Sequence, residues 1–154
     1  MSTFKVSPHL GRHIHDINVL EQTCYGTNAW DYDRISKFLE SSRGYCAVAT
    51  YGKEVIGACF YELGPAKSVK ILRITVREDQ RRRKVGTKMI REIESLRSKL
   101  RPVASAVVSE YDLSSQLFLQ KVGWRCVSTL PNQLGSGIDG YIFHSGRVFG
   151  EESK

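Results

Sequence analysis

The stretch that decides the fold runs from residue 76 to residue 90 and reads Val76-Arg-Glu-Asp-Gln-Arg-Arg-Arg-Lys-Val-Gly-Thr-Lys-Met-Ile90. The residues before it, 69–76, alternate between two faces and are rich in β-branched side chains, which predicts a strand. The residues after its basic run carry apolar side chains at helical spacing, which predicts a helix over 85–100. A strand, a basic turn and the start of a helix therefore follow one another here.

Such a junction is able to bind an anion. The first turn of a helix leaves backbone N–H groups without acceptors and carries the positive end of the helix dipole. Gly86 removes a side chain that would block a phosphate, and residues 81–84 add four consecutive cations. The alternative is that these cations form an ordinary solvated loop, and charge alone does not decide between the two interpretations.

The composition is that of an ordinary globular protein. The chain has 154 residues, 41% of them hydrophobic and 25% charged, which predicts a single domain over residues 1–154 with a frayed tail at 146–154. The net charge of +7 favours an acidic partner, and one phosphate-rich ligand fits the spread of basic residues at least as well as a nucleic acid. The sequence has no apolar run near the roughly 20 residues of a membrane helix, and its first residues, Met1-Ser-Thr-Phe-Lys-Val, lack the apolar core expected of a signal peptide. We therefore expect a cytoplasmic protein that does not contact a membrane.

The cysteines and histidines show no metal-binding pattern, so we expect no metal. The four cysteines lack the spacing of a zinc site, and mostly apolar surroundings favour reduced, buried thiols. These cysteines are Cys24, Cys46, Cys59 and Cys126. His13 and His15 lie two residues apart and do not share a helix face, so we interpret them as surface residues.

Hydrophobic patterning along the whole chain predicts the element order β-α-α-β-β-β-α-β-α-β-β. Strands are expected at 4–7, 45–51, 54–63, 69–76, 104–109, 124–129 and 140–144, and helices within 10–42 (interrupted at 24–33), at 85–100 and at 113–122. Asp31 or Asp33 is the expected N-cap of the second helix. This order predicts an α/β fold with a mixed central sheet of about seven strands and helices on both faces.

Two segments resemble the signatures of the Gcn5-related N-acetyltransferase (GNAT) superfamily. The segment from Gln80 to Thr87 resembles its pyrophosphate loop, Gln/Arg-x-x-Gly-x-Gly/Ala, with Arg81 and Gly86 at the ends and Lys84 in place of the middle glycine. The segment Asp112-Leu-Ser-Ser-Gln-Leu-Phe-Leu-Gln-Lys-Val-Gly-Trp124 resembles the second signature. Further similarity to the ribosomal-protein-alanine branch of protein N-terminal acetyltransferases is found at Leu20-Glu21, 28–32, 47–49 and 55–57. The resemblance spans roughly residues 4–145.

The resemblance implies a cosubstrate and the residues that bind it. In the family, acetyl-CoA lies between two splayed parallel strands, which correspond here to 71–76 and 104–109, and its pantetheine arm pairs with the first strand. Because the middle glycine is missing, Lys84 must keep a negative φ or accept strain. The implied cofactor-binding residues are Ile74, Thr75, Val76, Arg81, Arg82, Arg83, Lys84, Val85, Gly86, Thr87 and Asp112.

The chemistry stays open because both proton-transfer groups expected from the resemblance are replaced. Val107 stands where this branch commonly has a Glu or His base, and Leu119 where it has the Tyr that protonates the leaving thiolate. One alternative is catalysis by positioning, with a backbone oxyanion donor near Val76. In another, Tyr111 takes part, since it shares strand parity with residue 107, or Tyr141 does; a packing role for Tyr111 is the simpler interpretation.

The resemblance implies an N-acetyltransferase that moves an acetyl group from acetyl-CoA to a primary amine, with a protein N-terminus as one candidate acceptor. Trp30 and Tyr32 are then expected on one wall of the acceptor groove and the loop 130–140 on the other, unless Trp30 fills the core. One alternative is acetylation of a small-molecule amine. Another is a non-catalytic domain that binds acyl-CoA or, less favoured, a nucleic acid.

Overall fold

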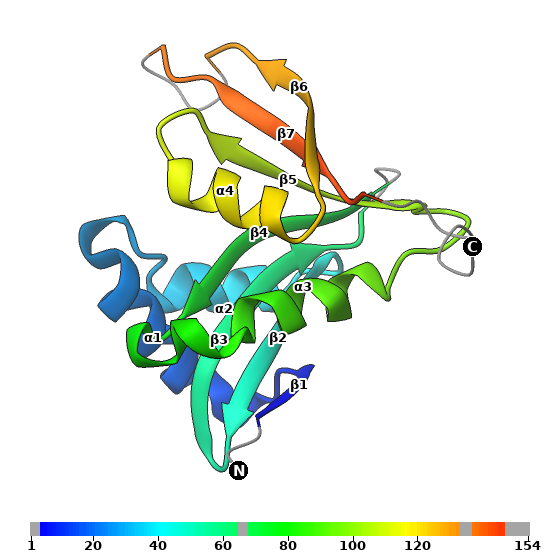
Figure 1. The fold of residues 1–154 in the computed structure, drawn as a ribbon. Helices are drawn as coiled ribbons and strands as arrows, with labels where there is room; N and C mark the ends of the chain where they lie inside the picture. The colour runs from blue at the N-terminus through cyan, green and yellow to red at the C-terminus, as the bar shows by residue number, and fades with distance from the viewer. Residues whose placement is uncertain (1–3, 65–67, 133–136, 147–154) are drawn as a thin grey trace. The chain divides into compact units, whose positions relative to one another are not determined.

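The computed structural model describes residues 4–64, 68–132 and 137–146, and its elements confirm the predicted order (Figure 1). The strands are β1 (Lys5–Pro8), β2 (Gly44–Tyr51), β3 (Glu54–Glu62), β4 (Ser68–Val76), β5 (Val103–Ser109), β6 (Arg125–Leu130) and β7 (Gly140–His144). The α-helices are α1 (Ile14–Tyr25), α2 (Tyr32–Glu40), α3 (Val85–Glu94) and α4 (Leu113–Lys121). Short 3-10 helices are η1 (Gly11–His13), η2 (Gly26–Asn28) and η3 (Glu78–Arg83).

The strands form one mixed seven-stranded sheet in the order β1-β2-β3-β4-β5-β7-β6. The pair β4 and β5 is parallel, whereas β1 with β2, β2 with β3, and β7 with both β5 and β6 are antiparallel. The parallel register runs from Ser68 opposite Val103 to Ile71 opposite Ala106, although both strands continue beyond it. The predicted α/β fold with a parallel strand pair is thus confirmed.

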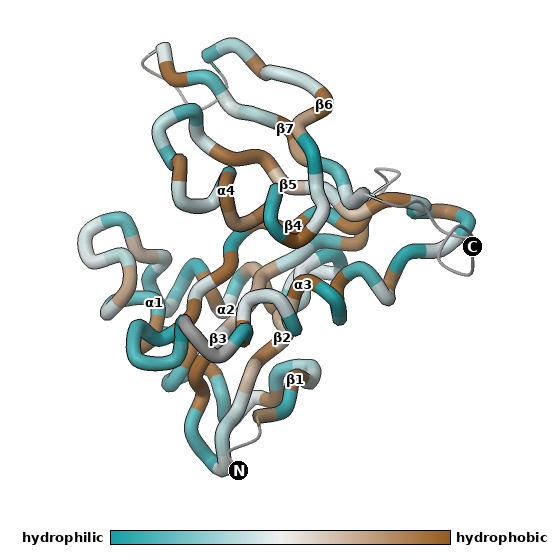
Figure 2. The backbone as a smooth tube through the Cα atoms, in the orientation of Figure 1, coloured by the Kyte–Doolittle hydropathy of each residue, from teal (hydrophilic) through white to brown (hydrophobic). Residues whose placement is uncertain are grey.

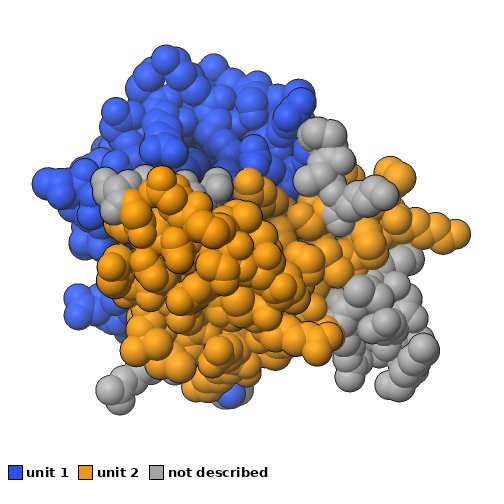
Figure 3. Space-filling model, turned by 90° about the horizontal axis from the view of Figure 1, so that it is seen from above, with its two compact units in different colours: residues 1–64, 72–93 blue, residues 65–71, 94–154 orange. Residues whose placement is uncertain are grey.

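The chain divides into two compact units (Figure 3). Unit 1 comprises residues 1–64 and 72–93, and unit 2 comprises residues 65–71 and 94–154. The strand β4 contributes to both, because its first residues belong to unit 2 and its last residues to unit 1. The expectation of a single domain stays a prediction.

Helices cover both faces of the sheet in unit 1. On one face, α1 packs on β3 and α2 on β2, and the buried core between them includes Ile17, Ile35 and Phe60. On the other face, α3 approaches so closely that a Cβ atom added at Gly57 would lie 3.1 Å from the Met89 side chain. Figure 2 shows the hydrophobic residues along β3 that these helices cover.

Unit 2 has its own core beside α4. The buried hydrophobic side chains of this unit include Leu119, Val122, Trp124 and Phe143. The Trp124 indole N–H donates to the Glu94 carboxylate at 3.2 Å, so this buried polar group is satisfied.

The predicted helix over 85–100 is wrong at its C-terminal end, because α3 stops at Glu94. The backbone N–H and the Nε of Arg97 both donate to the Glu94 carbonyl, at 3.2 and 2.7 Å, and close the chain into a turn. Leu96 and Leu100, which extended the apolar spacing, lie beyond this turn and are 39% and 76% exposed. Spacing alone therefore overstated the helix.

The structure also tests the predicted helix cap, the buried cysteines and the surface histidines. Asp31 is the N-cap of α2, since its carboxylate accepts the Arg34 N–H at 2.8 Å. Cys46 and Cys59 are buried as expected, but Cys126 is exposed. The interpretation of His13 as a surface residue is wrong, because only 8% of it is exposed.

Some predicted features fall where the structure gives no description. These are the tail at 147–154 and the centre of the 130–140 loop, residues 133–136. Among the described residues, no helix combines the length and the apolar character that crossing a membrane requires.

Candidate active site

The end of β4 presents its backbone in a fixed alternation. The N–H of Arg77 donates to the Ile56 carbonyl at 2.8 Å, so the backbone of residue 77 faces β3. Because successive residues of a strand face opposite edges, the N–H and C=O groups of Ile74 and Val76 face away from β3. These are the residues predicted to pair with a pantetheine arm.

The carbonyl groups at this edge have side-chain partners. The Tyr25 hydroxyl donates to the Ile74 carbonyl at 2.9 Å, and the Arg81 Nε donates to the Val76 carbonyl at 3.0 Å. Cys24 Sγ also lies 3.6 Å from the Val76 carbonyl oxygen. A ligand that lies along this edge is therefore able to pair with the backbone N–H groups, whereas the carbonyls of Ile74 and Val76 already accept from Tyr25 and Arg81.

The basic turn ends in a left-handed residue. Lys84, the C-cap of η3, has φ 61° and ψ 28°. Of the two outcomes expected for the missing glycine, strain is therefore the one observed, and a left-handed conformation disfavours a non-glycine residue by about 1–2 kcal/mol. This conformation lets the chain turn from η3 directly into α3.

The start of α3 provides backbone donors next to these cations. The first helical hydrogen bond runs from the Lys88 N–H to the Lys84 carbonyl at 3.0 Å. The N–H groups of Val85, Gly86 and Thr87 precede that bond, and groups in this position have no intrahelical acceptor. They form the kind of helix start that binds phosphate, with the exposed side chains of Arg81 and Lys84 adding charge.

A buried carboxylate joins α1 to β4 and was missed by sequence reasoning. Glu21 is 0% exposed and forms an ion pair with Arg73. Its carboxylate also accepts the Trp30 N–H at 3.1 Å and the Thr75 hydroxyl at 3.2 Å. Thr75, predicted to bind the cofactor, is thus bound to α1 through its side chain.

The guanidinium of Arg73 links further parts of the same region. It lies 3.7 Å from the centroid of the Tyr25 ring and donates to the Asn28 carbonyl at 2.8 Å. Burial raises the pKa of Tyr25, and the nearby Arg73 charge opposes that rise. Tyr25 is therefore neutral at pH 7, and its hydroxyl donates the hydrogen bond to the Ile74 carbonyl. The signal for this network was present in the sequence: a glutamate four residues after Ile17 on the core side of a predicted helix, and an arginine on the buried face of a strand.

The two candidate acceptor residues have different environments. Trp30 lies in the core, where its ring stacks on Phe60 at 4.9 Å and meets Phe38 edge-on at 5.4 Å. The core interpretation therefore accounts for Trp30. Tyr32 is exposed at the first residue of α2.

Asp112 serves as the N-cap of α4 in unit 2. Its carboxylate accepts the backbone N–H of Ser115 at 3.1 Å and the Ser115 hydroxyl at 2.7 Å. The residue that the resemblance assigns to the cofactor thus has a structural role in starting this helix.

The remaining catalytic candidates also belong to unit 2. Tyr111 is 76% exposed, but the strand parity assigned to it is wrong: β5 ends at Ser109, and the Asp112 N–H donates to the Ser109 carbonyl at 3.0 Å to form a turn. Leu119 is 4% exposed and Val107 is half-buried opposite Ile142 of β7. Within the described part of the chain, no group of three or more His, Cys, Asp or Glu residues could hold a metal ion.

Comparison with known proteins places this geometry in a family. The sequence model of the acetyltransferase (GNAT) family matches residues 13–124. No curated protein sequence matches the chain significantly.

Solved structures share the fold at low sequence identity. The protein smu.2055 of Streptococcus mutans UA159 has a TM-score of 0.78 at 22% identity, over 91% of this chain and 97% of that one. Arabidopsis thaliana NAA60, solved with a bisubstrate analogue, has a TM-score of 0.78 at 16% identity, over 92% and 97%. The ribosomal-protein-S18-alanine N-acetyltransferase of Escherichia coli has a TM-score of 0.73 at 13% identity, over 93% of both chains. With the family model matching most of its length, the chain belongs to the acetyltransferase (GNAT) family.

Proposed function

We propose that the protein is an acetyl-CoA-dependent N-acetyltransferase that acts on a primary amine, with a protein N-terminus as the favoured acceptor. The observation that carries this proposal is the end of β4 followed by the start of α3 in a member of the GNAT family. A strand edge with two outward-facing N–H groups suits a pantetheine arm, and the helix start with adjacent cations suits a pyrophosphate.

In this proposal, the loop from residue 81 to residue 87 holds the cosubstrate through backbone and charge. The N–H groups of Val85, Gly86 and Thr87 donate to the pyrophosphate, and the cations of 81–84 neutralise it. The carbonyls of Ile74 and Val76 keep a second lone pair beside the bonds from Tyr25 and Arg81, so they can also accept from the bound arm.

The reaction requires a neutral amine to attack the thioester carbonyl, after which the C–S bond breaks and its electron pair leaves on sulfur. Val107 and Leu119 have no group that transfers protons. We therefore assign most of the rate to positioning and to the Val76 N–H as oxyanion donor. Tyr111, whose hydroxyl is free to reach solvent and ligands, stays the candidate for proton transfer.

The preference for a protein N-terminus rests on fold similarity. The similar structures include an N-acetyltransferase that acts on a ribosomal-protein alanine and one bound to a bisubstrate analogue. A small-molecule amine is the alternative, since an aminoglycoside 6'-N-acetyltransferase with coenzyme A also shares the fold, with a TM-score of 0.73.

A CoA-release assay tests the proposal. Acetyl-CoA is incubated with the protein and separate panels of peptides and small amines, and mass spectrometry locates the acetyl group on the product. We expect release above the hydrolysis rate with free N-terminal peptides and none with N-terminally blocked peptides. Release with small amines only would transfer the activity to the alternative acceptor class. If no acceptor raises release above hydrolysis although acetyl-CoA binds, the protein is a binding domain and the enzyme proposal fails.

A further inference from the structure

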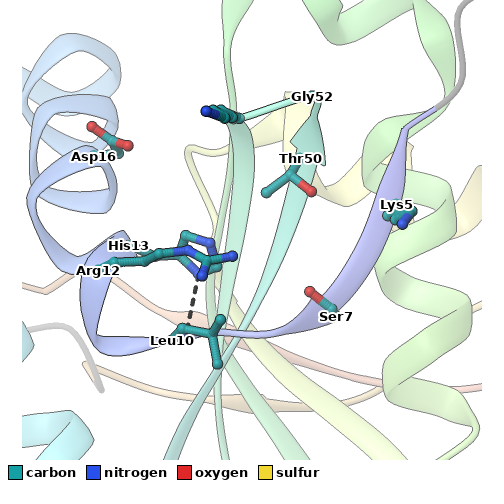
Figure 4. Close-up of a pocket in the computed structure, with 9 residues that line it drawn as sticks. Lys5, Ser7, Leu10, Arg12, His13, Asp16, Thr50 and Gly52 are labelled. Carbon is teal, nitrogen blue, oxygen red and sulfur yellow. Dashed lines mark hydrogen bonds between the residues drawn. The ribbon is translucent and has the colours of Figure 1, made fainter.

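A recess lies in unit 1 where η1 leads into α1, and none of its lining residues belongs to the cofactor site proposed above (Figure 4). Its volume is about 900 Å³. The residues that line it are Lys5, Ser7, Leu10, Arg12, His13, Asp16, Thr50, Gly52 and Lys53. The recess is thus bounded by β1 and the end of β2 on one side and by the start of α1 on the other.

On the strand side of the recess, polar side chains lie on the same face of the sheet as the buried core residue Val48. In the register of β1 and β2, Lys5 lies opposite Thr50 and Ser7 opposite Val48, so all four side chains share one face. Val48 is fully buried in the core below α1 and α2. Lysine, serine and threonine at the end of this face contribute little to that core, which leaves them available to a ligand.

The recess has an excess of uncommitted positive charge. Lys5, Arg12 and Lys53 carry three cations against the single carboxylate of Asp16. The side chains of these four residues form no ion pair or hydrogen bond with any other residue in the described ranges. By contrast, Arg77 of the same unit forms ion pairs with Glu54 and Asp79. Such an unpaired set attracts an anion.

A buried histidine supplies a fixed neutral donor to the same space. His13 is 8% exposed, and its Nδ1 accepts the Leu10 N–H at 2.9 Å. In a neutral imidazole whose Nδ1 accepts a hydrogen bond, the proton resides on Nε2. Burial, followed by the charges of Arg12 and His9, lowers the pKa of His13, which keeps the ring neutral at pH 7. Its Nε2–H has no acceptor among the described residues, and Figure 4 shows the ring directed toward the strands.

We propose that this recess binds a small organic phosphate monoester, independently of the acetyl-transfer site. The phosphate accepts from the Arg12 guanidinium, the Lys53 ammonium and the Nε2–H of His13. The hydroxyls of Ser7 and Thr50 supply further donors. The volume exceeds what a bare phosphate fills, so the organic part occupies the rest, where Asp16 accepts from a hydroxyl of the ligand.

The test follows the His13 ring by ¹H–¹⁵N NMR while the full chain is titrated with inorganic phosphate or with glucose 6-phosphate. We expect saturable shifts of the His13 ring and of the Ser7 and Thr50 amides, with at least tenfold tighter binding for the sugar phosphate. Arg12→Ala combined with Lys53→Ala should weaken that binding at least tenfold. Both side chains are exposed, so the variant should keep its fold, which circular dichroism checks.

Two control variants test whether phosphate binds in this recess and not at other basic parts of the surface. Lys37→Ala removes an exposed cation on α2, and Gly86→Glu blocks the proposed pyrophosphate site. Neither should change the shifts at His13. Absence of saturable shifts there, equal binding by the double variant, or loss of the shifts in Gly86→Glu would each overturn the proposal. Equal affinity for inorganic phosphate would refute the organic ligand. Acetyl-CoA binding is measured separately, so a failure of either site does not imply a failure of the other.

Discussion

The ion pair between Glu21 and Arg73 should hold α1 against the last residues of β4. Glu21 is completely buried and Arg73 largely so, and the carboxylate accepts from Trp30 and Thr75 as well. Glu21→Gln keeps the shape of the side chain and removes its charge. It leaves the Arg73 guanidinium uncompensated, although one amide oxygen still accepts the Trp30 N–H.

The magnitude follows from burial. Removing one partner of a buried ion pair lowers the free energy of unfolding by about 3–5 kcal/mol. Because Gln keeps one hydrogen bond and Arg73 is partly exposed, we expect the low end, about 3 kcal/mol, for Glu21→Gln. Replacing both partners at once, with Glu21→Leu and Arg73→Met, should be less destabilising than the sum of the two single changes.

Urea unfolding followed by tryptophan fluorescence measures these changes, since Trp30 lies beside Glu21. The matched control is Lys37→Ala, which breaks the exposed pair with Asp33 and should lower the free energy of unfolding by only about 0.3–0.5 kcal/mol. A loss below about 1 kcal/mol in Glu21→Gln, or additive effects in the double variant, would refute the view that this pair fastens α1 to β4.

Three further predictions concern single positions. Lys84→Gly should raise the free energy of unfolding by about 0.5–1 kcal/mol, because it relieves the left-handed strain at φ 61° while adding chain entropy; an unchanged or lower melting temperature would contradict this. Burial raises the pKa of Cys46 from 9.0 to about 12. The contribution of the neutral thiol to the free energy of unfolding is therefore complete below pH 9 and falls by up to about 4 kcal/mol as the pH rises toward 12. Cys46→Ala should make the free energy of unfolding, measured by urea titration, fall less steeply at alkaline pH, and an unchanged slope would contradict this. Leu119 is buried, so Leu119→Tyr and the control Leu119→Phe should both lower the free energy of unfolding by about 1–3 kcal/mol through overpacking. Only the tyrosine should raise CoA release if thiolate protonation limits the rate. A fall in release for the tyrosine variant alone would indicate that a different group protonates the thiolate.

Local patterns predicted the order of the elements and a mixed sheet, whereas the parallel strand pair was implied by the family resemblance. Alternation over 69–76 located β4, and helical spacing from Val85 located α3. The missing glycine pointed to Lys84 as either strained or differently turned, and the structure shows the strained form. These features depend on residues close to one another in sequence, which is why they were predictable.

The features that were missed depend on distant partners. The bond from Glu21 to Thr75 and the ion pair to Arg73 join segments about fifty residues apart, which periodicity does not register. His13 is buried because its ring turns back onto the Leu10 N–H, a bond that its spacing from His15 does not indicate. For the Glu21 network and for the burial of His13, the available signal in the sequence was a charged or polar residue near positions expected to face the core.

Calorimetric titration with acetyl-CoA tests the central claim, that residues 81–87 form its binding loop. We expect micromolar binding by the unmodified protein, which Gly86→Glu abolishes because a side chain and a negative charge enter the helix start. The matched control is Gln120→Glu, which adds the same charge on the exposed side of α4 and should bind normally. The claim is contradicted if the unmodified protein does not bind acetyl-CoA at micromolar concentration, or if folded Gly86→Glu protein binds it with unchanged affinity.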